Sequence, residues 1–190
     1  GSRLTLRQVG LNETRCAVIS ALRRMGAHMD IVKTSPEDAG EPYGDITIYG
    51  AGSLHGTALL PEEIPNLIDE IPILAVAGAL GQGDFIVRNA RELRVKETDR
   101  IAALRTELKK LGYLIEEEND SVLMWNGERC EPEAVPVIAT YEDHRMAMAF
   151  APAVISCPNL LIADPQVVSK SYPGYWEDLK QAGFQVINEG

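Results

Sequence analysis

Cysteine is scarce in this sequence, and the few cysteines form no motif. The 190 residues include three of them, Cys16, Cys130 and Cys157, which lie far apart with no Cys-x-x-Cys pair. An odd number of scattered cysteines disfavours a disulfide framework or a structural zinc site and is typical of a reducing compartment. We therefore expect a cytoplasmic protein with no metal site. We also expect no cofactor.

Positive charge and long apolar runs are also scarce. Lysine and arginine number 18 against 28 acidic residues, which gives a net charge of −10. Such a charge repels nucleic acid and anionic membranes, and no apolar run approaches the length of a membrane span or resembles a signal peptide. We expect a globular protein that binds neither nucleic acid nor membrane. Any site for an anionic ligand must be a local basic cluster.

One pattern occurs three times along the chain. A strand leads to a helix with a basic end, the helix stops at a glycine (Gly26, Gly112 or Gly183), and another strand follows. Glycine readily takes the left-handed conformation that ends many helices. The leading strands are expected near residues 4–9, 85–87 and 160–162. A repeated unit of this kind predicts an α/β fold, with units at about 4–31, 84–117 and 159–188.

Two further helices are expected between the units, near residues 64–80 and 144–155. Both are apolar on nearly every side, so we expect them to be internal helices wrapped by sheets and by outer helices. Pro152 predicts a kink or a break in the second one. A buried helix precedes the second and third units but not the first. We therefore expect the chain to start partway through a repeat, as a fragment truncated at its N-terminus.

The string RVKETDR, residues 94–100, concentrates charge at a helix start. The apolar spacing of the residues that follow predicts a helix that begins near Glu97. Arg94, Lys96 and Arg100 crowd this end, where exposed N–H groups already carry partial positive charge, and Lys96 and Arg100 repel each other. A solvated first turn would accommodate these charges. A docked phosphate or carboxylate explains them better.

Charged residues also stand at the starts of the two buried helices. Asp143 is expected to cap the second one. His144 alone is more often structural than catalytic, but Arg145 opens an apolar helix and needs an anionic partner. Asp69 stands at the start of the first buried helix, where it could simply be a cap, and Lys170 lies in the polar connection before the third helix. If these ends converge, they form an anion site with acid/base groups beside it.

Four strings together resemble the family of 5-enolpyruvylshikimate-3-phosphate synthases (3-phosphoshikimate 1-carboxyvinyltransferases). They are RVKETDR, YEDHRMAM, DPQVVSKSYPGYW and the opening VGLNETR…ALRRMGA, and they occur in the family's order over nearly the whole chain. The resemblance implies an enolpyruvyl transferase fold, an inside-out α/β barrel in which βαβαββ-like units surround buried helices. It also implies that residues 1–190 are a single domain, most of the C-terminal half of a two-domain enzyme whose N-terminal half is absent.

The family joins phosphoenolpyruvate to the 5-hydroxyl of shikimate 3-phosphate through a tetrahedral intermediate and then expels phosphate, a step of aromatic amino-acid biosynthesis. By resemblance, Asp69 contacts the 5-hydroxyl and handles its proton. Glu97 protonates the methylene carbon of phosphoenolpyruvate, and His144 lines the same site. Two carboxyls with different proton loads suit this chemistry. Which carboxyl performs which transfer stays open.

The resemblance assigns substrate binding to four cations. Lys96 matches a lysine on the shikimate-phosphate side, and the phosphoenolpyruvate carboxylate and phosphate are gripped by Arg100, Arg145 and Lys170. Glyphosate becomes a candidate inhibitor. Glu92 stands where some members of the family carry asparagine.

Two alternatives remain from the sequence. UDP-N-acetylglucosamine enolpyruvyl transferases share the fold, although DHRMAM and SKSYPG are not expected in them. A non-catalytic interaction domain would use its charged loops to bind a partner, and it predicts no convergence of the charged helix starts. The glycines of residues 78–83 match neither a dinucleotide fingerprint nor a phosphate loop, and they indicate a helix end and a turn.

Overall fold

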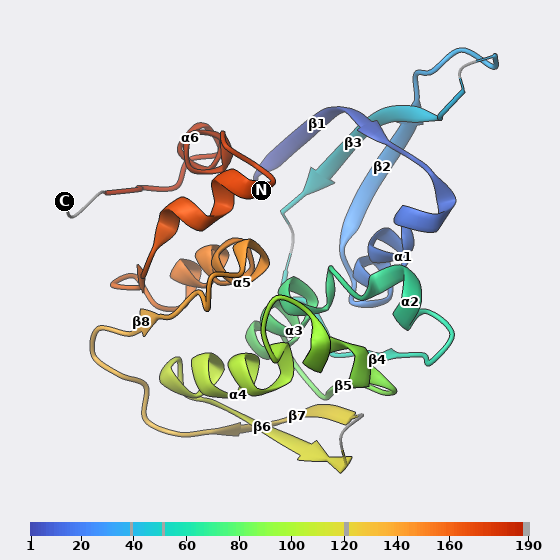
Figure 1. Ribbon diagram of the computed structural model, residues 1–190. Coiled ribbons are helices and arrows are strands. Elements are labelled where there is room, and N and C mark those ends of the chain that lie inside the picture. Colours follow the sequence, from blue (N-terminus) through green and yellow to red (C-terminus); the bar gives the residue numbers. More distant parts are fainter. Residues whose placement is uncertain (39, 51, 120–121, 188–190) are drawn as a thin grey trace.

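Three small β-sheets surround a group of central helices (Figure 1). The computed structural model describes residues 1–38, 40–50, 52–119 and 122–187, with residues 122–128 described by their backbone alone. The expected α/β architecture of repeated units around buried helices is confirmed. Within the described ranges, no helix is both long enough and apolar enough to cross a membrane.

The first unit forms a three-stranded antiparallel sheet in the order β1-β3-β2. Gly26 ends the helix with φ +92°, as predicted. The sequence predicted both strands of the repeat but not β3, which lies between them. The elements are β1 (Arg3–Gly10), η1 (Glu13–Arg15), α1 (Ala17–Arg24), β2 (His28–Lys33) and β3 (Tyr43–Tyr49).

The second unit forms a four-stranded sheet in the order β4-β5-β7-β6. Gly112 has φ +86° and is followed by β6, as predicted. Helix α4 begins at Arg100 rather than near Glu97, because the Asp99 carboxylate caps it by accepting the Ala102 N–H at 3.0 Å. The elements are β4 (Ala58–Leu59), β5 (Phe85–Val87), η2 (Ala90–Val95), α4 (Arg100–Lys110), β6 (Tyr113–Glu118) and β7 (Val122–Arg129).

The third unit has only a two-stranded parallel sheet, β8-β9. Gly183 has the expected left-handed backbone, with φ +98°. The strand predicted after it is wrong over residues 184–187, which pair with no strand in the described part of the chain, and Asn188 lies outside that part. A lone extended segment has no partner for its N–H and C=O groups. The elements are β8 (Val137–Ile138), β9 (Leu161–Ile162), η5 (Pro165–Lys170) and α6 (Tyr175–Gln181).

The two helices predicted between the units form the centre of the molecule. Helix α3 (Ile71–Leu80) and helix α5 (His144–Phe150) pack against each other, and most of their side chains are buried. Their apolar residues join those of α4 in one continuous core. The prediction of internal helices is therefore confirmed.

Proline interrupts both of these helical segments. The segment predicted over residues 64–80 divides into α2 (Ile64–Leu67) and α3. Pro72 has no N–H to donate to the carbonyl of Ile68, so the helix cannot run through this point. Pro152 likewise ends α5, and the chain continues as the 3-10 helix η4 (Ala151–Ile155), which confirms the predicted break.

Candidate active site

Arg100, the first residue of α4, links carboxylates from three helix starts. Its side chain is 0% exposed. Nε donates to Asp143 Oδ2 at 2.8 Å, Nη2 donates to Glu97 Oε2 at 2.9 Å, and Nη1 donates to Asp69 Oδ1 at 3.3 Å. A buried guanidinium needs such partners for its fixed fork of donors. One cation thus brings the starts of α3, α4 and α5 together.

Asp69 lies between two arginines and does not cap a helix. The N-cap position of α3 is Glu70, which excludes the alternative that Asp69 is simply a helix cap. Arg145 Nη2 donates to Asp69 Oδ2 at 3.1 Å, whereas Arg100 donates to Oδ1, the other oxygen of the same carboxylate. Burial works against the charged form, but attraction by Arg145, Arg100 and Lys96 outweighs it, and the pKa of Asp69 is lowered. Asp69 is therefore an ionised carboxylate at neutral pH.

Glu97 connects this cluster to the third unit. Its Oε1 lies 3.9 Å from Nζ of Lys170, whose side chain is 63% exposed at the end of η5. Lys96 pairs with Glu92 Oε1 at 3.0 Å and is 25% exposed. Lys170, Lys96 and Arg145 are therefore cations that an incoming anion can reach.

Arg94, the remaining cation of the RVKETDR string, has other partners. It pairs with Asp99 Oδ2 at 2.7 Å and with Glu117 on β6. These contacts tie η2 to α4 and to the sheet, so Arg94 supports the fold beside the site.

His144 is the first residue of α5 and is 6% exposed. Asp143 caps the helix, as predicted, and accepts the Arg145 N–H at 2.9 Å. Burial lowers the pKa of His144, and the charges of Arg145 and Lys170 act in the same direction against Asp143 and Glu97. The imidazole is therefore neutral at neutral pH. Its buried Nδ1 has no hydrogen-bond partner among the residues that the structure describes.

Comparison with known proteins decides the family. A sequence profile of the family described as "EPSP synthase (3-phosphoshikimate 1-carboxyvinyltransferase)" matches residues 1–179. The chain belongs to the EPSP synthase family. A 3-phosphoshikimate 1-carboxyvinyltransferase of Akkermansia muciniphila is 64% identical over 182 residues, which are 95% of this chain and 41% of that protein. One from Bacteroides fragilis is 55% identical over 127 residues, 67% of this chain and 31% of that protein. The chain thus spans less than half the length of these relatives.

Solved structures agree on the fold. The EPSP synthase of Acinetobacter baumannii superposes with a TM-score of 0.83 at 31% identity, over 96% of this chain and 42% of that one. An enolpyruvyl transferase of Streptomyces tendae, 18% identical, superposes with a TM-score of 0.64 over 96% of this chain and 39% of that one, and shows the shared fold alone. The expected enolpyruvyl transferase fold is therefore confirmed.

The contacts of this EPSP synthase family chain connect most of the residues predicted from sequence. Direct ion pairs join Asp69, Glu97, Arg100, Arg145 and Lys170 in one cluster. Lys96 lies near enough to help lower the pKa of Asp69. His144 lies near enough for the charges of several cluster members to act on its pKa. Their roles toward substrate stay predictions. Sequence reasoning missed Asp143 as a partner of Arg100, because a helix cap already explained that residue.

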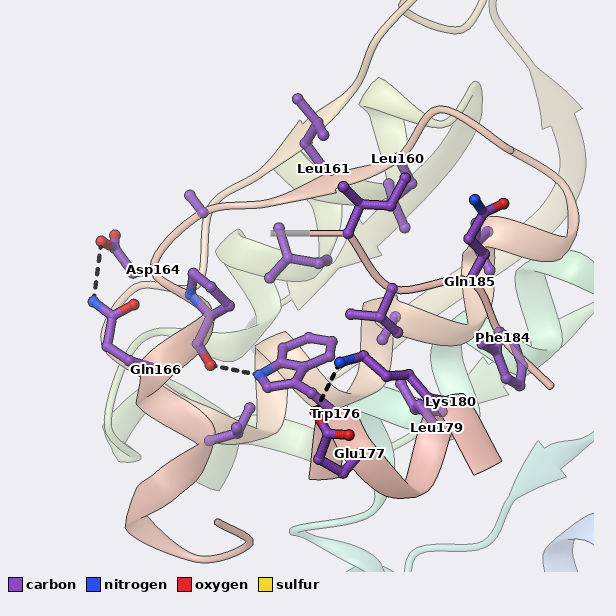
Figure 2. Close-up of a pocket in the computed structure, with 18 of the residues that line it drawn as sticks. Leu160, Leu161, Asp164, Gln166, Trp176, Glu177, Leu179, Lys180, Phe184 and Gln185 are labelled. Carbon is purple, nitrogen blue, oxygen red and sulfur yellow. Dashed lines mark hydrogen bonds and ion pairs between the residues drawn. The ribbon is translucent and has the colours of Figure 1, made fainter. Parts of the chain in front are cut away.

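A recess lies elsewhere on the molecule (Figure 2). It has a volume of about 840 Å³ between β9, η5 and α6 and is lined by side chains such as Leu160, Leu161, Trp176 and Phe184. It contains none of the predicted EPSP synthase site residues. In the charged cluster, the side chains of Lys170, Glu97 and Arg145 are partly exposed, whereas that of Arg100 is fully buried. In the described part of the chain, no group of His, Cys, Asp and Glu could hold a metal ion.

Proposed function

We propose that this chain supplies one wall of an active site that transfers the enolpyruvyl group of phosphoenolpyruvate to the 5-hydroxyl of shikimate 3-phosphate. The main support for this proposal is that acids and bases from three helix starts and from η5 meet in one cluster, in a chain of the EPSP synthase family. Residues 1–190 then form one domain, most of the C-terminal half. A separate N-terminal half supplies the opposite wall, and the enzyme works in the cytoplasm.

The reaction needs two proton movements that balance. The 5-hydroxyl oxygen bonds to C2 of phosphoenolpyruvate as that hydroxyl loses its proton and the methylene carbon gains one. The tetrahedral adduct then loses phosphate from C2 and a proton from the new methyl group, which restores the double bond. Asp69 is ionised between two arginines and can accept the hydroxyl proton,. Glu97 lies beside Lys170, where it can exchange a proton with the methylene carbon.

The cations have unequal access to an anionic substrate. Lys170, Lys96 and Arg145 are all partly exposed and can bind the phosphate and carboxylate groups directly,. Arg100 is fully buried and bonded to three carboxylates, so a substrate oxygen reaches it only by displacing Glu97 or Asp69. Binding of the substrate anion would therefore release one of these carboxylates for proton transfer.

The isolated chain is not expected to catalyse the reaction by itself. One open wall cannot hold both substrates against the reacting groups or exclude water from them. We therefore expect no turnover by the 190-residue chain. Glyphosate, which carries a carboxylate and a phosphonate, should compete for the same cations in the complete enzyme.

The test joins the chain to its N-terminal half and measures phosphate release from phosphoenolpyruvate. Release should require shikimate 3-phosphate as the acceptor, and Glu97→Gln should lower the rate by about 100-fold or more. Glu177→Gln on the exposed face of α6 is the matched control and should leave the rate unchanged. Release with UDP-N-acetylglucosamine would establish the alternative enolpyruvyl transferase. Turnover by the isolated chain would contradict the argument for a single wall.

A further inference from the structure

A strained turn carries the chain from β8 to the start of α5. Tyr141 and Glu142 both have left-handed backbones, with φ +56° and +55°, and the N–H of Asp143 donates to the Thr140 carbonyl at 2.9 Å. Two successive positive φ values define a turn that normally uses glycine or asparagine. A left-handed backbone costs other residues about 1–2 kcal/mol each. Contacts from outside the turn must therefore hold it in this shape.

Helix α4 supplies those contacts through Glu107. The Glu107 side chain is 0% exposed, its Oε1 accepts the Tyr141 O–H at 2.6 Å, and its Oε2 accepts the Ala139 N–H at 3.0 Å. Lys110 donates to the same Oε2 at 2.7 Å and to the Val137 carbonyl at 2.8 Å. Among the residues that the structure describes, the hydrogen-bond donors to this buried carboxylate come from α4 itself, from the segment after β8 and from the turn.

Glu107 and Arg100 are seven residues apart, which is about two helical turns, so they lie on the same face of α4. Arg100 holds the end of the turn through Asp143, and Glu107 holds its middle through Tyr141. Helix α4 thus holds the turn by two hydrogen-bonded contacts. The contact between Glu107 and Tyr141 restricts movement of the first residues of α5 relative to α4.

We propose that Glu107 and Tyr141 are positioning residues for the enolpyruvyl transfer site. They fix the turn 140–143, and this turn sets where His144 and Arg145 stand relative to Asp69. The inference rests on the proposed function, because it assigns these residues a purpose in that same site.

The chemistry of the pair favours positioning over simple packing. A buried carboxylate adds little stability over an apolar residue of similar size, so its presence here calls for a polar purpose. Tyr141 is 38% exposed, so part of its surface remains in contact with solvent. Burial and the bond to Glu107 raise the pKa of Tyr141 to about 12, so its O–H remains a donor at neutral pH. What the pair provides is a fixed geometry.

The first test is Tyr141→Phe in the joined protein, which removes one hydroxyl and leaves Glu107 with two donors. We expect kcat/KM for phosphoenolpyruvate to fall about tenfold, since a hydrogen bond to a charged acceptor is lost. The thermal midpoint should stay close to that of the parent protein. Tyr49→Phe is the matched control, because Tyr49 donates to Asp30 at 2.8 Å on the exposed sheet of the first unit. It should leave kcat/KM unchanged.

Two further measurements separate positioning from a general loss of structure. With histidine-selective isotope labelling, the His144 resonances of the joined protein should move in Tyr141→Phe and stay in place in Tyr49→Phe. Adding Glu142→Gly to Tyr141→Phe should recover part of kcat/KM, because glycine takes the left-handed conformation at little cost. Rescue of this kind is not expected if the tyrosine only packs.

The outcomes distinguish the inference from the proposed function. If the joined protein releases no phosphate, the function fails and the His144 resonances alone decide whether the turn is positioned by the pair. If it is active, and Tyr141→Phe matches the parent in kcat/KM and in the His144 spectrum, the positioning inference is overturned while the function stands.

Discussion

The second and third units have the same order of strand, helix, left-handed glycine and following segment, yet they differ in packing. The second places its strands in a four-stranded sheet, and α4 buries Ile101, Leu104 and Leu108 among others. The third has a two-stranded sheet, and α6 has no buried residue. The helix and its glycine are local features, so they form in both units. The last strand forms only where a neighbouring strand, here β7, is present to pair with it.

The same contrast divides the candidate site. The second unit contributes the buried Arg100 and its partner Glu97, whereas the third contributes the exposed Lys170 on a 3-10 helix. Substitutions in the second unit should therefore affect stability as well as activity. Substitution of Lys170, the site residue of the third unit, should affect activity alone. Four experiments can break or sharpen this comparison.

The largest expected effect is that of Arg100→Met on the stability of the chain. The substitution leaves Asp69, Glu97 and Asp143 crowded without their shared cation, and an uncompensated buried charge costs about 3–5 kcal/mol. Urea unfolding should show a loss of that size. The control is Arg105→Met on the same helix, where a 49% exposed arginine pairs with Glu117 at 3.0 Å and the loss should stay below about 1 kcal/mol. Equal losses would show that Arg100 has no special role in the core.

The second effect is on activity, through Lys170→Ala in the third unit. Because this lysine is 63% exposed, the free energy of unfolding should change by less than about 0.5 kcal/mol. Phosphate release by the joined protein should nevertheless fall about 100-fold, since a cation that faces the developing charge is lost. Lys180→Ala on α6, whose lysine pairs with Glu177 at 2.7 Å, should change neither quantity. A Lys170→Ala protein that loses stability but keeps its rate would reverse the division between the units.

The local parts of the fold could be predicted from the sequence, and the long-range parts could not. Helix-stop glycines and apolar helices show in a few residues, and Gly26, Gly112 and Gly183 all have the expected conformation. Strands β3 and β7 do not belong to the repeated pattern, and they exist because their neighbours supply hydrogen-bond partners. The break before α3 was also missed, although Pro72 signals it locally.

The candidate site divides in the same way. Clustered charges at helix starts pointed to Asp69, Glu97 and Arg145 as members of one site. The partner of each charge is a tertiary fact, so the burial of Arg100 among three carboxylates could not be foreseen. The Glu107–Tyr141 pair was missed because the two residues are 34 apart in the chain. The spacing of Arg100 and Glu107 on one helix face was the only signal.

A smaller effect, on pKa, tests whether the third unit reaches the central helices. The positive charge of Lys170 is one contributor, after burial, to the lowered pKa of His144. Lys170→Ala should therefore raise that pKa, which an NMR titration of the three histidines can follow, and Lys180→Ala should not. The pKa of His144 is lower in the folded protein than the value of about 6.5 expected in the unfolded chain,. At pH values just below about 6.5 the unfolded chain therefore binds more protons than the folded one. Stability should fall as pH drops through that range, and less so in His144→Gln. An unchanged His144 titration in Lys170→Ala would place the lysine outside the site.

The smallest expected difference is between two glycines in equivalent positions, Gly112→Ala and Gly183→Ala. Both alanines must adopt the left-handed backbone, at a cost of about 1–2 kcal/mol. At Gly112 the added Cβ also lies 2.8 Å from the Cys130 carbonyl oxygen, whereas at Gly183 nothing lies within 4 Å of it. Relieving that contact means moving the backbone directly after β7, so Gly112→Ala should lose about 1 kcal/mol more than Gly183→Ala in urea unfolding,. Equal losses would mean that the backbone at Cys130 yields freely, and the second unit would then be no more tightly packed than the third at this corner. A larger loss at Gly183 would show that the open end of the third unit is closed by contacts with some other segment in solution.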